Sequence, residues 1–226
     1  MSDRRFDIFP TPIWVGNFDN PELLEKTEQL SYFFRDNWEG ESSLVSDSWN
    51  KGEKSNKLED FQAKGFTSYN SVDLNLLYEW KQIGHAIHSA CKELLGDDWN
   101  ITGEHGLYGG MSIAKMWTTI YPPKCFVPEH IHSNNLVSGV FYVKAPENCG
   151  DIVFHDPNWV AKSMCSNGES TFPIKGGTKA PWTPVAGDLL LFPSWLPHYT
   201  EPNQSDEDRI IVSFNLSFEA LPMPSL

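Results

Sequence analysis

Apolar positions recur with a helical period in two stretches of the first hundred residues. In residues 20–38, apolar or small side chains follow one another at intervals of three or four, which places them on one helix face. Asn20 and Pro21 are residues typical of a helix N-terminus. Residues 72–95 repeat the pattern and meet Gly96, a residue typical of a helix end. The sequence therefore predicts two helices in the N-terminal part.

The pattern changes after about residue 98, where short runs rich in Val, Ile, Phe and Tyr are divided by Pro, Gly and Asn. Such runs predict β-strands, because branched and aromatic side chains suit a pleated surface. The runs are SIAKMWTTIY, LVSGVFYV, DIVFHD, DLLLFP and RIIVSFNLSF. No long helical pattern interrupts them, which favours an antiparallel barrel or jelly roll. We expect a mainly β fold with N-terminal helices.

Two segments without a clear period separate these elements. Residues 40–70 are rich in Ser, Lys, Asn and Gly, and residues 156–180 form a second polar excursion. Long loops in compact domains are often functional, so we interpret the first as a lid and the second as part of the barrel mouth. The chain shows no internal repeat and is interpreted as one domain, residues 1–226. Within it, residues 1–97 form a helical and loop part and residues 98–220 the β core.

Composition favours a packed globular protein and excludes some partners. Hydrophobic residues make up 40% of the 226-residue chain and aromatic residues 13%, enough to form a core. The formal net charge of −13 argues against nucleic acid, because phosphate binding needs a concentrated basic surface. We find no signal-peptide pattern and no bilayer-spanning apolar stretch, so we expect a soluble, cytoplasmic protein without a membrane partner. The four cysteines lack close spacing and are expected to be free thiols.

Three histidines combine into a candidate metal site. His130 and His132 lie in PEHIHSNNL, and side chains at i and i+2 of an extended chain point to the same side. His198 ends the apolar run LFPSWLPH. Imidazole binds iron, copper, nickel and zinc, and three protein ligands leave a catalytic metal an open position. Two histidines at this spacing are a weak signal by themselves, since surface imidazoles are the commoner explanation.

Arg209 opens the apolar run RIIVSFNLSF. An arginine that points inward from such a strand needs an anion to hold, whereas an outward, solvated arginine needs none. Together with a metal held from separated strands, an inward arginine suits a cosubstrate with carboxylates at both ends. 2-Oxoglutarate is such a molecule, because one end can chelate the metal while the other pairs with the guanidinium.

The second half of the chain resembles the Fe(II)- and 2-oxoglutarate-dependent oxygenases, with prolyl hydroxylases as the nearest well-understood relatives. The resemblance runs from MWTTIYPPKCFVPEHIH through LVSGVFYVKAPENCGDIVF to VAGDLLLFPSWLPHYTEPNQSDEDRIIVSFN. The opening FPTPIWVG, the H-x-H, SGVFYV and FPSWLPH are similar to a small group of bacterial and phage oxygenases. The resemblance implies a double-stranded β-helix, a cupin-like jelly roll, with helices packed outside the larger sheet.

The resemblance also implies roles for individual residues. His130 corresponds to the first metal ligand, His198 to the last, and Arg209 to the clamp on the distal carboxylate of 2-oxoglutarate. Tyr142 corresponds to a strand tyrosine that supports the same carboxylate, and Tyr121 to another tyrosine lining that pocket. The alternative interpretation of both tyrosines is a half-buried strand aromatic with its hydroxyl in water. Alternation along the strands adds Ser138 and Ser213 as weaker pocket candidates.

One position departs from the family's pattern. The usual motif is H-x-D, which supplies two histidines and one carboxylate, whereas position 132 is histidine. His132 could bind the metal, or lie behind a carboxylate such as Glu129 or Asp156, or the site could prefer another metal and not activate oxygen. We favour a three-histidine iron site, because the i, i+2 spacing delivers both rings together. The histidines interpreted as lying outside the site are His85, His88, His105 and His155.

The function implied by the resemblance is that of an Fe(II)- and 2-oxoglutarate-dependent dioxygenase, which couples oxidative decarboxylation of 2-oxoglutarate to substrate hydroxylation. Two alternatives stay open: a three-histidine cupin-type dioxygenase that does not use 2-oxoglutarate, and a non-catalytic ligand-binding barrel. The substrate is open between a small molecule and a protein residue such as proline, and the oligomeric state is open as well.

Overall fold

The computed structural model describes residues 11–37, 65–99, 108–158 and 178–220. In chain order its elements are β1 (Trp14–Asn17), α1 (Pro21–Asn37), β2 (Phe66–Thr67), the 3₁₀ turns η2 (Leu74–Leu76) and η3 (Tyr78–Trp80), α3 (Lys81–Trp99), β3 (Tyr108–Tyr121), β4 (Val137–Lys144), β5 (Ile152–His155), β6 (Lys179–Trp182), β7 (Asp188–Pro193), β8 (His198–Thr200) and β9 (Arg209–Ala220). Within these ranges, no helix has the length and apolar composition needed to cross a membrane.

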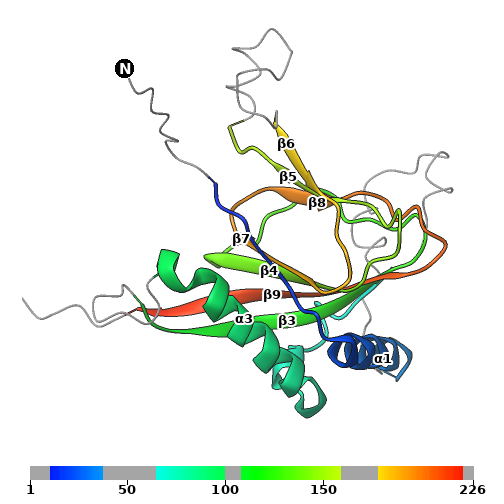
Figure 1. The fold of residues 1–226 in the computed structure, drawn as a ribbon, viewed down its shortest axis with the longest axis horizontal. Coiled ribbons are helices and arrows are strands. Elements are labelled where there is room, and N and C mark those ends of the chain that lie inside the picture. Colours follow the sequence, from blue (N-terminus) through cyan, green and yellow to red (C-terminus); the bar gives the residue numbers. More distant parts are fainter. Residues whose placement is uncertain (1–10, 38–64, 100–107, 159–177, 221–226) are drawn as a thin grey trace, which may run out of the picture.

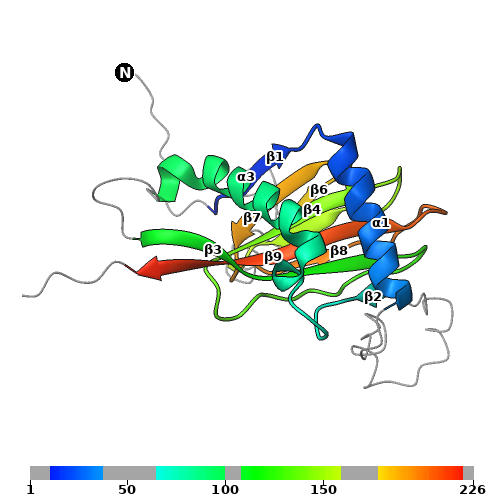
Figure 2. The ribbon, with the colours of Figure 1, turned by 90° about the horizontal axis from the view of Figure 1, so that it is seen from below.

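Two antiparallel sheets face each other across the barrel (Figure 1). The larger sheet has the strand order β1-β7-β4-β9-β3-β2, and the smaller sheet has the order β6-β5-β8. Helices α1 and α3 lie across the outer face of the larger sheet (Figure 2). This arrangement confirms the predicted fold, a mainly β jelly roll with flanking helices.

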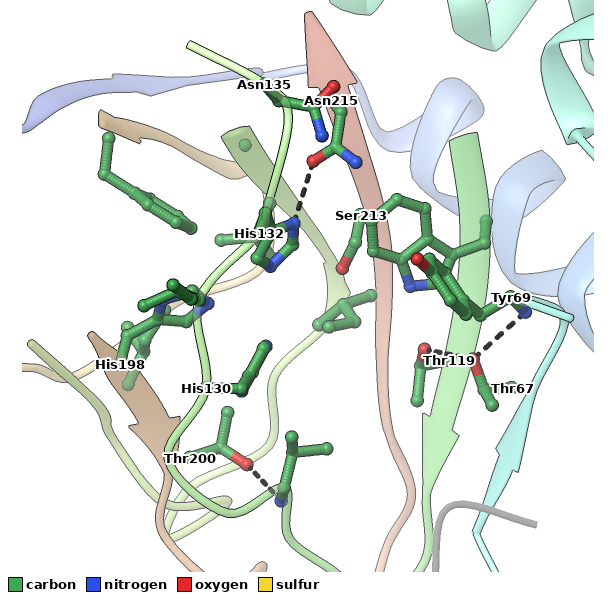
Figure 3. A pocket seen from close by; sticks show the side chains of 18 of the residues that line it. Thr67, Tyr69, Thr119, His130, His132, Asn135, His198, Thr200, Ser213 and Asn215 are labelled. Carbon is green, nitrogen blue, oxygen red and sulfur yellow. Dashed lines mark hydrogen bonds between the residues drawn. The ribbon is translucent and has the colours of Figure 1, made fainter. Parts of the chain in front are cut away.

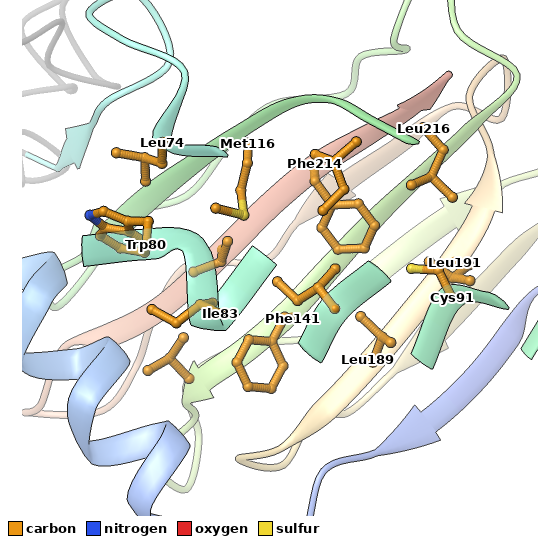
Figure 4. Close-up of a cluster of buried hydrophobic side chains, with 14 of the residues drawn as sticks. Leu74, Trp80, Ile83, Cys91, Met116, Phe141, Leu189, Leu191, Phe214 and Leu216 are labelled. Atoms are coloured by element: carbon orange, nitrogen blue, oxygen red, sulfur yellow. The ribbon is translucent and has the colours of Figure 1, made fainter. Parts of the chain in front are cut away.

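Alternation along the central strands gives the larger sheet two different faces. The β9 side chains that pack under the helices are Ile210, Val212, Phe214 and Leu216. The β9 side chains at the alternate positions, on the barrel side, are Arg209, Ile211, Ser213 and Asn215. Figure 4 shows the helix-side cluster, in which Trp80 and Ile83 pack near the sheet residues Phe141 and Phe214. The helix side therefore forms the main core and leaves the barrel side for polar groups.

Gly139 allows two neighbouring strands to pack in this core. It lies opposite Phe214 in the β4–β9 pairing. A Cβ atom at position 139 would lie 2.3 Å from Cζ of Phe214 and 2.8 Å from Cδ2 of Leu191. A side chain there would push the phenylalanine ring out of the cluster, so the close packing requires glycine.

The helix predictions were right for the first helix and wrong at both ends of the second. Helix α1 matches the predicted span, but α3 begins only at Lys81 and continues through Gly96 to Trp99. Leu77 adopts an extended conformation with ψ 135°, which interrupts the helical pattern before α3. As a result Leu76 is 72% exposed and not part of the buried stripe.

All five predicted strand runs are strands, but four shorter strands were missed. The short strands β1 and β2 pair with β7 and β3 at the two edges of the larger sheet. The part interpreted as helix and loop therefore also contributes to the sheet. Strands of four and two residues are too short to show a period in the sequence. Most of the two predicted loops, residues 38–64 and 159–177, lies outside the described residues.

The carboxylate of Asp188 joins β1 to the turn before β7. It is 5% exposed. Its Oδ1 accepts a hydrogen bond from Nδ2 of Asn17 at 2.9 Å. Its Oδ2 accepts from Nε1 of Trp182 at 3.1 Å and from the backbone N–H of Val185 at 3.1 Å. The buried carboxylate thus accepts hydrogen bonds from one donor on β1 and from two donors in residues 182–185.

We expect Asp188→Ala to lower the free energy of unfolding by about 3 kcal/mol, because hydrogen bonds to charged groups contribute about 1.5–3 kcal/mol each. Urea unfolding followed by tryptophan fluorescence measures the change. The exposed Asp206, changed to Ala, is the matched control and should shift the free energy by less than about 0.5 kcal/mol. Equal unfolding midpoints for the two variants would contradict the structural role of Asp188.

Candidate metal centre

Three imidazoles converge between the two sheets (Figure 3). His130 and His132 come from the segment between β3 and β4, and His198 begins β8. One potential ligand atom from each ring lies within 4.8 Å of those of the other two. The backbone N–H of His130 donates to the carbonyl of His198 at 3.0 Å, and the reverse bond measures 3.1 Å. This two-residue bridge fixes two of the three rings relative to each other.

The strand placement predicted for these histidines was wrong. Strand β7 ends at Pro193, and His198 begins a separate strand in the smaller sheet. His130 and His132 lie outside the named strands, and His130 makes only an isolated bridge. Pro193 and Pro197 explain the break after β7, since proline has no N–H to donate to a sheet ladder.

The ring nitrogens of two histidines are oriented by the chain immediately before them. Nδ1 of His130 lies 2.9 Å from the carbonyl oxygen of Pro128, and Nδ1 of His198 lies 2.9 Å from that of Leu196. A carbonyl oxygen only accepts, so each Nδ1 carries the proton. The lone pair of each imidazole is then on Nε2, which is the tautomer that a metal ligand requires.

His132 is oriented by a series of hydrogen bonds through Asn215, Ser138 and Ser194 in the barrel wall. Its Nδ1 donates to Oδ1 of Asn215 at 2.8 Å. The same oxygen accepts from the hydroxyl of Ser138 at 2.9 Å, and that hydroxyl lies 2.7 Å from Oγ of Ser194. Because Ser138 donates to the amide, Ser194 donates to Ser138. The backbone N–H of His132 also donates to the carbonyl of Ser194 at 2.9 Å, so both the ring and the main chain of His132 are held.

Asn215 is the residue of this centre that the sequence predictions missed. The sequence indicated its place, because alternate residues of a strand share a face and position 215 alternates with Arg209 and Ser213. Ser138 was predicted as a pocket residue, but it does not appear among the residues that line the cavity. It is fully buried behind Asn215 and contacts the centre through that amide.

Burial keeps all three imidazoles neutral. Removal from water lowers the pKa of His130 below its usual value, that of His132 to about 4 and that of His198 to about 3. The largest cause in each case is desolvation, which disfavours the charged imidazolium. Neutral rings near pH 7 keep their lone pairs available for a metal.

The two carboxylates considered as alternative ligands do not join the histidines. Among the described residues, the only group of His, Cys, Asp and Glu able to hold a metal is the three histidines. Oε2 of Glu129 lies 2.6 Å from Nδ1 of His155 instead. Oδ1 of Asp156 accepts from the backbone N–H of Asn158 at 2.8 Å. The ligand set in the described structure is therefore three neutral nitrogens.

A cavity of about 590 Å³ extends from the three histidines into the barrel. Of the predicted pocket residues, Tyr121, Tyr142 and Ser213 line it. The two tyrosines are 3% and 1% exposed, and burial raises the pKa of both phenols above the usual value. Both are neutral hydrogen-bonding groups at neutral pH.

Arg209 points into the protein and is fully buried. Its Nη1 donates to the carbonyl oxygens of Cys149 at 2.7 Å and Gly150 at 3.1 Å, and its guanidinium carbon lies 4.3 Å from the centre of the Tyr121 ring. Nε and Nη2 are buried and make no hydrogen bond with the residues that the structure describes. Gly150 has φ +87°, a conformation that suits glycine and presents its carbonyl to the arginine.

Two unpaired donors on a buried cation are costly, since each unsatisfied buried polar group costs about 1–3 kcal/mol. A carboxylate that accepts from both Nε and Nη2 would remove this cost. The guanidinium does not line the cavity itself; it lies against Tyr121, which does. The guanidinium therefore lies behind the cavity wall with two donors that the described residues leave unpaired.

The other histidines that the structure describes do not belong to the three-histidine group. His85 is exposed on α3, and Nε2 of His88 lies 2.8 Å from the carbonyl oxygen of Met111. His155 contacts Glu129, as described above. His105 lies outside the described residues.

Residues 115–215 match the family described as "Putative 2OG-Fe(II) oxygenase". The match begins in β3, ends at Asn215, and contains the three histidines and Arg209. It confirms the resemblance that was recognised from the sequence motifs. No functionally curated protein matches the chain.

Solved structures with the same fold include oxygenases of several kinds. A Pseudomonas putida prolyl-4-hydroxylase has a TM-score of 0.56 at 14% identity, covering 91% of this chain and 92% of its own. The alpha ketoglutarate dependent epimerase SnoN from nogalamycin biosynthesis has a TM-score of 0.57 at 14% identity, covering 92% and 77%. A Trichoplax adhaerens prolyl hydroxylase in complex with a hypoxia inducible factor peptide has a TM-score of 0.55 at 16% identity, covering 92% and 83%. At these identities the likeness shows the fold, which serves more than one reaction.

We expect Asn215→Ala to weaken binding of Co(II) or Fe(II) by about 10–100-fold, the usual effect of removing the partner of a ligating histidine. The variant leaves Nδ1–H of His132 without its acceptor, so the ring loses its fixed orientation. Titration of metal-free protein with Co(II), followed by visible absorption, measures the affinity. Asn70→Ala, a change at the cavity wall, should keep the wild-type affinity. Equal affinities for the two variants would remove Asn215 from the centre.

Proposed function

We propose that the chain is an Fe(II)- and 2-oxoglutarate-dependent oxygenase whose iron is held by His130, His132 and His198. The family match and the fold indicate a 2OG-Fe(II) oxygenase. The observation that carries the proposal is the combination, within one barrel, of three converging imidazoles and a buried arginine with two unpaired donors.

The three histidines suit Fe(II) because imidazole is a good ligand for it and because three protein ligands leave positions open. The carbonyls before His130 and His198 and the amide of Asn215 hold the proton of each ring on Nδ1, and the potential ligand atoms of the three rings lie within 4.8 Å of one another. When bound, iron supplies oxygen activation, and 2-oxoglutarate supplies two electrons through its decarboxylation to succinate and carbon dioxide. The protein's own task is to orient the cosubstrate and the substrate around that point.

Arg209 is proposed to pair with the distal carboxylate of 2-oxoglutarate through Nε and Nη2. The neutral phenols of Tyr121 and Tyr142 line the same cavity and are proposed to donate hydrogen bonds to that carboxylate. Ser213 lines the cavity between the arginine and the metal centre along β9, and is proposed to add one further hydrogen bond. These groups would fix the cosubstrate by one end and leave the other for the metal.

Hydroxylation of an uncharged C–H group is the proposed outcome of the reaction. It is supported by the prolyl hydroxylases among the proteins of similar fold. A three-histidine dioxygenase that does not use 2-oxoglutarate is the second candidate, because no carboxylate joins the metal ligands in the described residues. The unpaired donors of Arg209 favour the first candidate, since they match a carboxylate at the inner end of the barrel.

The test is an anaerobic titration of metal-free protein with Fe(II) and then 2-oxoglutarate, followed by the visible charge-transfer band of the chelate. We expect a band in the wild type and its loss in His132→Ala. Arg209→Met should need more than about 30-fold higher 2-oxoglutarate, because loss of a buried charge pair costs at least about 2 kcal/mol. Its affinity for Fe(II) should stay unchanged, since the arginine does not contact the imidazoles.

Arg35→Met is the matched control, because Arg35 lies on the surface in an ion pair with Asp36. It should bind 2-oxoglutarate as the wild type does. Circular dichroism and the retained metal affinity show whether Arg209→Met is folded. Tight iron binding without a band in the wild type would sink the 2-oxoglutarate proposal and favour the second candidate. Oxygen consumption with thiol substrates would then test that candidate.

A further inference from the structure

The wall of the cavity carries no charged side chain in the described part of the chain. The whole sequence holds 30 acidic and 17 basic residues. The lack of charged side chains in the described wall is therefore a property of this cavity and not of the composition of the chain. The polar lining groups beyond the imidazoles and phenols are hydroxyls of Ser and Thr and amides of Asn. A charged substrate group would lose its water here without meeting an opposite charge.

One part of this wall is aromatic and leads outward from the metal centre. The ring of Trp117 lies 5.8 Å from that of His132, with an angle of 31° between the planes. Tyr69 packs edge-on against Trp117 with ring centres 4.9 Å apart (Figure 3). Trp117 is buried, whereas Tyr69 is 44% exposed. A flat group that enters the cavity therefore meets an aromatic surface up to the ligand ring.

Residues 131–135 complete the outer wall with amides, a hydroxyl and one apolar side chain beside the His132 ring. The apolar side chain is that of Ile131, which is 50% exposed. Asn135 donates from Nδ2 to the carbonyl of Ser133 at 2.9 Å. Apolar side chains exposed to water beside neutral polar groups are typical of a site for an uncharged organic molecule.

The cations nearest to the cavity do not line it. The ammonium of Lys115 lies 3.9 Å from the centre of the Tyr69 ring, and the guanidinium of Arg209 lies against the ring of Tyr121. Neither residue is part of the described wall.

We propose that the outer cavity binds an uncharged group with a flat apolar face and amide or hydroxyl hydrogen-bonding atoms, and that it discriminates against ammonium and carboxylate groups. The assignment of this group as the substrate rests on the proposed function. Binding of the group itself rests on the lining of the cavity.

Three indole compounds that differ mainly in charge provide the test: indole-3-acetamide, indole-3-acetate and tryptamine. Their binding is measured by calorimetry with the metal-free protein, and by the shift of the charge-transfer band with the anaerobic Fe(II)–2-oxoglutarate form. We expect the neutral amide to bind at least about tenfold more tightly than tryptamine in both forms, and at least about tenfold more tightly than indole-3-acetate in the 2-oxoglutarate-loaded form, in which Arg209 is already paired.

Two variants with matched controls locate the binding site. Ser133→Asp adds a carboxylate to the cavity wall, so it should weaken the binding of indole-3-acetate and strengthen that of tryptamine. Ser89→Asp, on the exposed face of α3, should change the binding of neither compound. Tyr69→Ala should weaken the amide about fivefold or more, since stacking on one aromatic ring contributes about 1–3 kcal/mol. Tyr78→Ala, at a side chain 81% exposed and away from the cavity, should not.

Equal or tighter binding of tryptamine in either form or of indole-3-acetate in the loaded form, or no binding of the amide in either form, would overturn the proposal. Binding of the amide that Ser133→Asp and Tyr69→Ala leave unchanged would overturn its location. The outcome is separable from the proposed function. Amide binding to the metal-free protein with no charge-transfer band would retain the neutral site and reject the oxygenase. A band without amide binding would retain the oxygenase and reject the substrate class.

Discussion

The two backbone hydrogen bonds between His130 and His198 are the constraint on which the site depends. They join the segment after β3 of the larger sheet to β8 of the smaller sheet, and the pairing continues where Thr200 donates to the carbonyl of Val127 at 3.0 Å. The mouth of the barrel is thereby closed along the line where the metal ligands lie. These backbone bonds set the relative placement of His130 and His198, two of the three histidines.

Asn215 both holds the ring of His132 and lines the uncharged cavity. An amide oxygen holds the tautomer of His132 as a carboxylate would, but it adds no charge. Together with the three uncharged ligands, this keeps the surroundings of the centre electrically neutral in the described structure. The neutral ligand set and the uncharged wall are therefore consistent with each other.

The sequence predicted the features that depend on local pattern and missed those that depend on tertiary contacts. Strands such as β4, apolar on both faces, and the long stripe of α1 were recognisable from composition and period. The β8 strand was not, because it has only three residues, and its partners, β5 and the segment 127–130, come next to it only in the folded chain. Asn215 reads as one polar residue in an apolar run until pairing places its amide against His132. The unpaired donors of Arg209 depend on its surroundings and leave no trace in the sequence.

The alternation of β9 divides the effects of mutation between its two faces. Phe214 belongs to the core beneath the helices, so a change there should act through folding and cellular abundance. Ser213 and Asn215 face the cavity, so changes there can leave a stable protein without its chemistry. Substitutions at neighbouring positions of one strand can therefore act for different reasons, one by weakening the fold and the next by altering the cavity. A shift of one residue in the pairing register of β9 would move its core side chains to the cavity face and its cavity side chains to the core. The register of this strand therefore sets both the core and the site.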